Sequence, residues 1–312
     1  MTLARIAIRD YPSVFLNLEA ARTAFRRVRG ASGVEKNKTA PPEFRRTPQK
    51  PGDPFSAIPE GLTHFEDWGA VQLEGPMSVL VISDLHIPYH DKTAVVAALK
   101  WGADNSIDTI LLNGDISDCF ACSFWEKDPR KREFAVELQT VHSFLDTLKN
   151  AFPKARIIYK QGNHEERYDR YMRVKAPELL SVAQFDPIEI LGLNKLGIEW
   201  VAEKRPIRLG KLNTIHGHEH NFAISNPVNP ARGFFLRAKT HCLGGHFHQK
   251  SEHSEKNLEE KVISTWSTGC LCDLHPDYRP INPWCHGFAF VEVFDKGEFN
   301  VRNFKILHGK VY

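Results

Sequence analysis

The 312-residue sequence predicts an α/β fold from three observations made along the chain. Short apolar runs rich in β-branched residues, at 79–82, 107–112 and 156–159, are typical of buried strands. Helical apolar patterns at 93–103 and 132–150 separate these runs. Strands that alternate with helices in this way predict parallel pairing with right-handed crossovers. With 42% hydrophobic and 25% charged residues, the composition excludes wholesale disorder.

The amino-terminal part differs from the rest and predicts an appended arm. Residues 1–34 carry a helical pattern, whereas 36–60 contain six prolines among basic and polar residues, which is typical of a linker. Residues 1–52 hold eleven Lys and Arg against four Asp and Glu, a net charge of +7, while the whole chain carries +3. We therefore expect a basic helical arm with its linker at 1–60 and a catalytic domain at 61–312. The arm either binds nucleic acid or is a solvated tail.

Hydropathy along the chain predicts a cytoplasmic protein that does not bind membranes. No stretch approaches the ~18 consecutive apolar residues of a membrane helix. The first 30 residues contain many charges and no apolar signal-peptide core. Six cysteines in a chain of this length do not form a disulfide scaffold. The sequence leaves the oligomeric state open.

The second half of the chain predicts further short strands with few helices, and we expect more antiparallel pairing there. These strands are expected at 198–201, 206–209, 212–215, 262–266, 288–294 and 299–307. A short apolar segment near 241–243 precedes two glycines and two histidines.

Blocks of polar residues follow the predicted strands at five places. These blocks are Asp84-Leu85-His86, Gly114-Asp115, Gly162-Asn163-His164-Glu165, His216-Gly217-His218 and Gly245-His246-Phe247-His248. In open α/β sheets the carboxyl ends of the strands form the ligand crevice, so we expect the blocks to meet. Each block alone is compatible with a turn, a helix cap or a surface histidine. Together, their carboxylate, amide and imidazole groups favour a site for divalent metal ions.

In this order the blocks resemble the calcineurin-like metallophosphoesterase superfamily, and in particular stand-alone phosphoesterases of bacteriophages and prophages. The resemblance covers roughly residues 77–310. It implies a four-layer α-β-β-α sandwich of two mixed sheets. It also implies hydrolysis of a phosphate ester by a hydroxide that two divalent transition-metal ions activate. Mn is the first choice, with Fe, Zn and Ni as alternatives.

The resemblance assigns a metal-binding role to seven residues. For the first ion, the implied ligands are Asp84, His86 and His248. For the second ion, they are Asn163, His216 and His246. Asp115 is implied to bridge the two ions.

The resemblance also implies that His164 protonates the leaving group and that Asp118 orients His164. Glu165 is expected either to brace its loop or to be an ordinary first-turn carboxylate of a helix. His218 is expected to line the pocket. Arg232 either contacts the substrate phosphate or is a surface arginine at the start of a helix.

The type of ester is less strongly indicated. Protein phosphatases of this superfamily carry an Asp-Arg-Gly run where this chain has Asp118, Cys119 and Phe120, so one phosphate-gripping arginine is missing. Phe124 and Trp125 lie nearby in sequence and are either core residues or a surface for stacking bases. We predict a phosphodiesterase acting on a nucleotide or nucleic acid. The alternatives are a phosphomonoesterase and a nucleic-acid-binding protein with an accessory phosphoesterase body.

Overall fold

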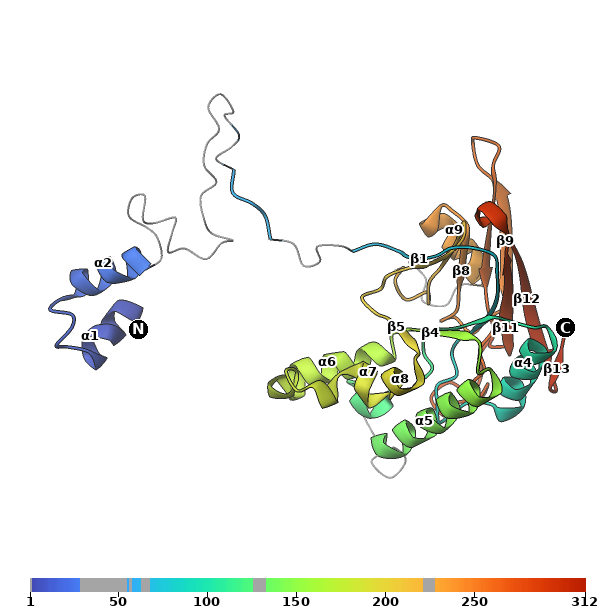
Figure 1. The fold of residues 1–312 in the computed structure, drawn as a ribbon, viewed down its shortest axis with the longest axis horizontal. Helices are drawn as coiled ribbons and strands as arrows, with labels where there is room; N and C mark the ends of the chain where they lie inside the picture. The colour runs from blue at the N-terminus through green and yellow to red at the C-terminus, as the bar shows by residue number, and fades with distance from the viewer. Residues whose placement is uncertain (1, 29–54, 56–57, 63–67, 126–132, 221–227) are drawn as a thin grey trace. The chain divides into compact units, whose positions relative to one another are not determined.

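The computed structural model describes residues 2–28, 55, 58–62, 68–125, 133–220 and 228–312 (Figure 1). The chain divides into two units, residues 1–68 and 69–312, which we describe separately. The predicted boundary after residue 60 stays a prediction. No described helix has both the length and the apolar character needed to cross a membrane.

The amino-terminal unit contains helices α1 (Leu3–Asp10) and α2 (Leu18–Val28). They pack through a small apolar cluster built on Ala4, Ala7 and Ala21. Arginines lie on the outside of this pair, for example Arg26, whose only described ion pair is with the exposed Glu19. The helical prediction for this region is confirmed as far as Val28, and Gly30 and most of the proline-rich stretch lie outside the described residues.

The larger unit contains a seven-stranded sheet in the order β13-β12-β11-β2-β3-β4-β5. Its strands are β2 (Met77–Ile82), β3 (Thr109–Asn113), β4 (Arg156–Lys160), β5 (Glu199–Val201), β11 (Gly287–Val293), β12 (Phe299–Leu307) and β13 (Lys310–Val311). Strands β2 to β5 are parallel, and β11 joins β2 in antiparallel pairing. Helices α4 (Lys92–Asp104) and α5 (Phe134–Ala151) are the crossovers that the sequence predicts.

A second sheet of six strands has the order β1-β6-β7-β8-β10-β9. Its strands are β1 (Val71–Leu73), β6 (Ile207–Leu209), β7 (Leu212–Thr214), β8 (Cys242–Gly244), β9 (Ser251–Lys256) and β10 (Val262–Ser267). Strand β8 pairs in parallel with both β7 and β10, whereas β6 with β7, β9 with β10 and β11 with β12 are antiparallel. The second half of the chain is therefore mixed, with more antiparallel pairing than the first half, as expected. The sequence analysis missed β9 because its six residues are all polar, as an exposed edge strand permits.

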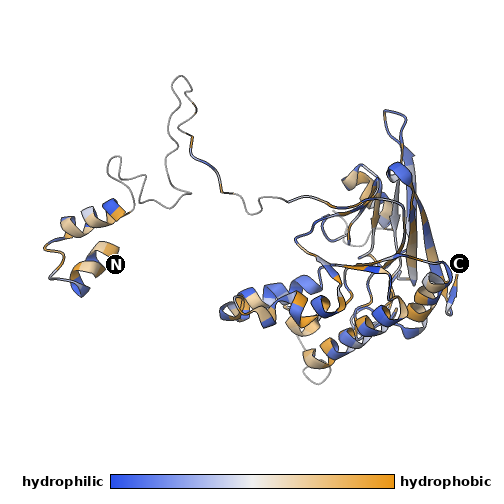
Figure 2. Ribbon diagram, viewed as in Figure 1, coloured by the Kyte–Doolittle hydropathy of each residue, from blue (hydrophilic) through white to orange (hydrophobic). Residues whose placement is uncertain are grey.

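Three apolar clusters join the four layers, and the smallest of them, with Phe234 of α9 (Pro230–Ala238) and Cys242 of β8, lies under the helix of the second sheet. Of the two larger cores, one lies between the two sheets and joins residues such as Val81 and Leu111 to Leu209 and Leu243. The other lies between the seven-stranded sheet and helices α4 and α5. Helix α9 packs on strands of the second sheet. The predicted α-β-β-α sandwich is confirmed, and Figure 2 shows the stripes of apolar and polar residues along its helices.

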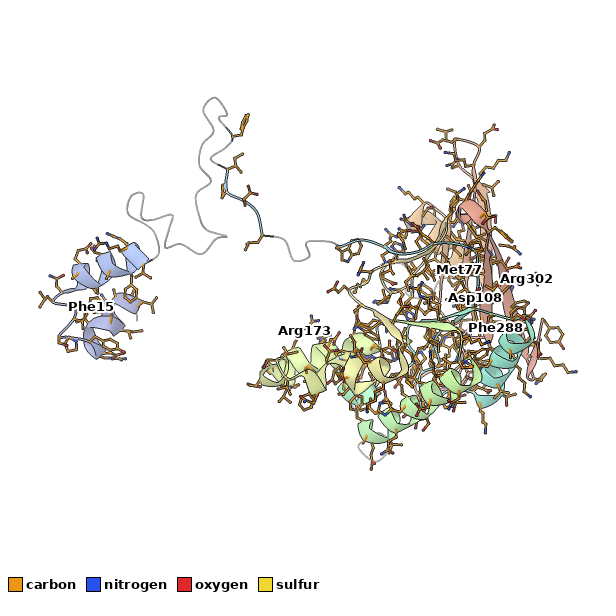
Figure 3. The ribbon with its side chains drawn as sticks, in the orientation of Figure 1. Phe15, Met77, Asp108, Arg173, Phe288 and Arg302 are labelled. Atoms are coloured by element: carbon orange, nitrogen blue, oxygen red, sulfur yellow. The ribbon has the colours of Figure 1, made fainter. Side chains whose placement is uncertain are left out.

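The strands of the first sheet are fixed at their amino-terminal ends by Asp108. Its carboxylate accepts a hydrogen bond of 3.0 Å from the Ser78 amide, and its own amide donates to the Ser78 carbonyl. Figure 3 labels Asp108 beside Met77, the first residue of β2. The parallel strands therefore start together, and their carboxyl ends reach the same edge.

Candidate metal centre

The predicted polar blocks come together at the carboxyl ends of strands from both sheets. The loops after five strands hold the seven predicted ligands: Asp84 and His86 after β2, Asp115 after β3, Asn163 after β4, His216 after β7, and His246 and His248 after β8. All seven are buried or half-buried. Among the described residues, four groups of three have their candidate ligand atoms within 4.8 Å of one another, and two of these consist of predicted ligands alone: Asp84, His86 and Asp115, and Asp115, His216 and His246. Asp115 belongs to both of these, as a bridging ligand would. The other two groups add Cys272, which was not predicted, and the pair Asp118 and His164.

The orientation of two histidine rings indicates a cation between them and the carboxylates. Nδ1 of His86 lies 3.1 Å from Asp118 Oδ1, and Nδ1 of His216 lies 2.8 Å from the Asn113 carbonyl oxygen. Because both partners only accept hydrogen bonds, each Nδ1 carries the proton and each Nε2 presents a lone pair in the neutral ring. Nε2 of His216 lies 3.2 Å from Asp115 Oδ2. Two acceptors this close repel one another unless a metal ion, or a second proton on the ring, lies between them.

Further acceptors in the same space lack a hydrogen-bond donor. Asn163 Oδ1 and His216 Nε2 are buried, and neither has a hydrogen-bond partner among the residues that the structure describes. The Nε2 atoms of His86 and His248 lie 3.2 Å apart. A buried polar atom without a partner is costly, and metal coordination removes that cost. The residues therefore fit a pair of divalent ions, and the assignment of each ligand to one ion stays a prediction.

The backbone of the site is strained. Five predicted ligands have a left-handed φ: Asp84 (56°), His86 (48°), Asp115 (53°), His246 (69°) and His248 (58°). Residues other than glycine adopt this region rarely, and such strain gathers at functional sites. Gly114 has a φ of +87°, and a Cβ there would lie 2.5 Å from His216 Nδ1. The glycine of the second block is therefore needed for close approach as well as for the turn.

His164 lies beside the cluster, and its predicted role as a residue that protonates the leaving group without binding metal stays a prediction. Its Nδ1 lies 3.0 Å from Asp118 Oδ1, and its Nε2 lies 3.7 Å from Asp115 Oδ2. Nε2 also accepts a hydrogen bond of 2.7 Å from Nη2 of Arg167. Asp118 thus contacts both His164 and the predicted ligand His86, a double role that the sequence analysis did not foresee.

Most of the larger unit matches a known protein family. Residues 77–279 match the family described as calcineurin-like phosphoesterase. This chain belongs to the calcineurin-like phosphoesterase family. It is therefore a metal-dependent hydrolase of phosphate esters with a dinuclear site. The resemblance inferred from the five blocks is confirmed.

Among individual relatives of this phosphoesterase, two are phage proteins. The Gene 54 protein of Mycobacterium phage L5 is 27% identical over 228 residues, which cover 69% of this chain and 88% of the relative. The Gene 54 protein of Mycobacterium phage D29 is 27% identical over 179 residues, or 55% of this chain and 69% of the relative. Among solved structures, Vacuolar Protein Sorting 29 from Cryptosporidium parvum has a TM-score of 0.41 and 16% identity, covering 77% of this chain and 96% of its own. The expected likeness to phage proteins is confirmed.

Charges inside the phosphoesterase site are strongly coupled. Burial opposes ionisation of Asp115, but His164 and His216 beside it hold its pKa well below the usual range. Burial also opposes the charged form of His216, yet Asp115 outweighs it and raises the pKa of His216 to about 10, so a proton on Nε2 balances Asp115 wherever a metal ion does not. Burial and the neighbouring charge of His216 lower the pKa of His246 to about 3. The carboxylates therefore stay ionised and demand positive charge beside them.

Glu165 braces two of the metal loops of the phosphoesterase, the first of the two roles expected for it. It begins helix α6 (Glu165–Lys175) and is only 4% exposed. Its carboxylate accepts five hydrogen bonds of 2.8–3.0 Å, from the amides of Asp115, Ile116, Ser117 and Gly162 and from the hydroxyl of Tyr159. One side chain thus ties the Asp115 loop to the Asn163 loop.

A second brace was missed in the sequence analysis. Glu219 accepts hydrogen bonds from the amides of His216 (3.0 Å) and Gly217 (2.6 Å). Lys160, whose side chain is fully buried at the end of β4, lies 2.8 Å from Glu219. The ion pair therefore joins the His216 loop to the first sheet. Lysine as the last residue of an apolar strand was the one signal in the sequence.

The two predicted substrate-binding residues differ in their surroundings. His218 is nearly buried, and its Nε2 lies 2.9 Å from Glu166 Oε1, with its ring 5.4 Å from that of His216. Arg232 is exposed in the first turn of α9, where its amide is capped by the side chain of Asn229. The helix start expected around Arg232 is confirmed, and the substrate roles of both residues stay predictions.

Proposed function

We propose that this phosphoesterase hydrolyses phosphodiesters of nucleotides or nucleic acids, with Mn as its metal. The observation that carries the proposal is an exposed aromatic pair, Phe124 and Trp125, on the segment that follows Asp118. Their side chains are 67% and 59% exposed, so they are not core residues. Their ring centroids lie 4.6 Å apart, and the Arg170 guanidinium lies 5.1 Å above the Phe124 ring. An aromatic surface with an arginine suits the stacking of nucleobases, worth about 1–3 kcal/mol per base.

This aromatic pair lies near the reacting groups because helix α6 contacts both. Its residue Arg170 contacts Phe124, and Arg167, one turn earlier, contacts His164. The short helical turn η2 (Phe120–Cys122), which precedes the pair, also packs on α6. A base attached to the scissile phosphate would therefore find a stacking surface within reach.

The metal ligands and His164 divide the chemistry of hydrolysis between them. Asp84, His86 and His248 would hold one ion, Asn163, His216 and His246 the other, and Asp115 both. Such a pair of ions neutralises charge on phosphate oxygens and activates water. His164 would protonate the leaving oxygen through Nε2, which its contact with Asp118 through Nδ1 aims toward the centre.

A pair of chromogenic substrates tests the type of ester. The ratio of kcat/KM for bis-p-nitrophenyl phosphate to that for p-nitrophenyl phosphate, measured in Mn at one pH, should favour the diester. Phe124→Ala together with Trp125→Ala should lower kcat/KM for a dinucleotide by about tenfold or more, which corresponds to the stacking energy of one base. It should leave the chromogenic diester within about twofold. A tenfold preference for the monoester, with no cleavage of nucleic acid or cyclic nucleotides, would contradict the proposal in favour of a phosphomonoesterase.

The alternative of a nucleic-acid-binding protein is favoured by the amino-terminal charge of +7 on residues 1–52. Such an arm would attract a polyanion with an affinity that falls steeply as salt is added. Retention on DNA by the full chain and by a variant without residues 1–60 separates the possibilities. Binding that depends on the arm, without any cleavage in Mn, would make the phosphoesterase body accessory.

A further inference from the structure

Arg167 is a cation beside the predicted general acid that neither the family pattern nor the sequence analysis assigned. It lies three residues after His164 in the first turn of α6, so both side chains lie on one face of the helix. Its Nη2 lies 2.7 Å from His164 Nε2, and its Nη1 donates to the Asp118 carbonyl oxygen at 3.0 Å. Both contacts lead to residues of the reacting centre.

The charge of Arg167 is not neutralised by any carboxylate within ion-pair distance in the part of the chain that the structure describes. Its two partners, an imidazole nitrogen and a carbonyl oxygen, are neutral acceptors. By contrast, the exposed Arg156 forms two hydrogen bonds to both oxygens of Glu199. A half-buried guanidinium that has no carboxylate partner among the described residues suits an anionic ligand, because a planar fork binds two oxygens of a phosphate at once.

We propose that Arg167 binds a non-bridging oxygen of the substrate phosphate, and this inference rests on the proposed phosphoesterase function. His164 Nε2 lies 3.7 Å from Asp115 Oδ2. A phosphate bound by the metal ions beside Asp115 would therefore lie within reach of a guanidinium that already contacts His164. Arg167 thereby takes the place of the arginine that is missing after Asp118, but from a different segment of the chain. Contact with phosphate would also end the hydrogen bond from Nη2 to Nε2, so that Nε2 could take a proton from water and pass it to the leaving oxygen.

The test measures binding of inorganic phosphate, the simplest anion that this site would hold, to the full-length Mn-loaded protein. Titration calorimetry gives its Kd, and inhibition of bis-p-nitrophenyl phosphate hydrolysis gives its Ki. Arg167→Ala should weaken both by about 10- to 100-fold, as expected for a hydrogen bond between charged groups. Arg167→Lys should recover part of the loss, because it restores the charge without the fork. Arg173→Ala, an exposed arginine two turns further along α6 (Figure 3), is the matched control and should change neither constant by more than about twofold.

The outcomes separate this inference from the proposed function. If wild-type protein with bound Mn hydrolyses neither the diester nor the monoester, the proposed function fails. If wild type is active and Arg167→Ala lowers kcat while Kd and Ki for phosphate stay unchanged, Arg167 only positions His164 and the inference is overturned. Equal losses of phosphate affinity in Arg167→Ala and Arg173→Ala would also overturn it. Unchanged Mn content and melting temperature in Arg167→Lys ensure that a folding defect is not mistaken for lost binding.

Discussion

Replacement of Glu165 by glutamine should loosen both metal loops at once. Oε1 accepts hydrogen bonds from Ile116, Ser117 and Tyr159, and a glutamine oxygen can keep these three. Oε2 accepts from the amides of Asp115 and Gly162, and an NH₂ group in its place would face two donors. A buried donor left unpaired costs about 1–3 kcal/mol, so the two together predict a loss of about 2–6 kcal/mol in the free energy of unfolding.

Urea unfolding of metal-free protein measures this loss directly. Glu166→Gln is the matched control, because that neighbouring carboxylate is partly exposed and its ion pairs among the described residues are with His218 and Lys204. It should cost less than about 1 kcal/mol. The second readout is Mn affinity, which should fall in Glu165→Gln because Asp115 and Asn163 lose their common support. Equal stability and equal Mn affinity in the two variants would refute the idea that Glu165 fixes the site.

Three further predictions concern catalysis, pH and the amino-terminal arm. His164→Ala should keep its metal but lose about 10²–10⁴ in kcat for a poor leaving group and less for p-nitrophenolate; equal losses would show that His164 is not the acid. Burial raises the pKa of Glu137 from 4.5 to about 7, so its protonated form favours the folded state. The free energy of unfolding of the metal-free protein should therefore fall as pH rises from 4.5 to 7, by about 1.4 kcal/mol per pH unit at most. In Glu137→Gln, the free energy of unfolding measured in urea should depend less on pH over this range. Removal of residues 1–65 should preserve activity on small substrates, whereas aggregation or a melting point lower by several degrees would show that the arm packs on the body.

The sequence predicted those helices and strands whose buried faces produce a regular pattern of apolar residues. The central strands and helices α4 and α5 followed from apolar runs, because each packs against one of the two larger cores. Strand β9 did not, since residues Ser251–Lys256 lie at a sheet edge and bury little. The short edge strand β1 was also not predicted, and of its three residues only Leu73 is buried.

The meeting of the five polar blocks could be predicted because each follows a strand directly, and four of them contain a glycine that permits a tight turn. The residues that support them could not, since a brace is defined by contacts across the fold. Glu219 and Lys160 lie far apart in sequence and meet only because β4 and the His216 loop are neighbours in space. Arg167 was missed for a related reason: an arginine in a charged helix such as Glu165–Lys175 looks like part of a solvated face until its contact with His164 is known.

The central claim is that seven side chains from five loops hold two metal ions. Elemental analysis of protein that has been loaded with Mn and then desalted tests this claim most directly, with Asp115→Asn measured alongside. About two ions per chain are expected for the wild type. Asp115→Asn should retain fewer, because the charge shared by both ions is lost. One bound ion or fewer per wild-type chain after Mn loading would contradict the dinuclear site.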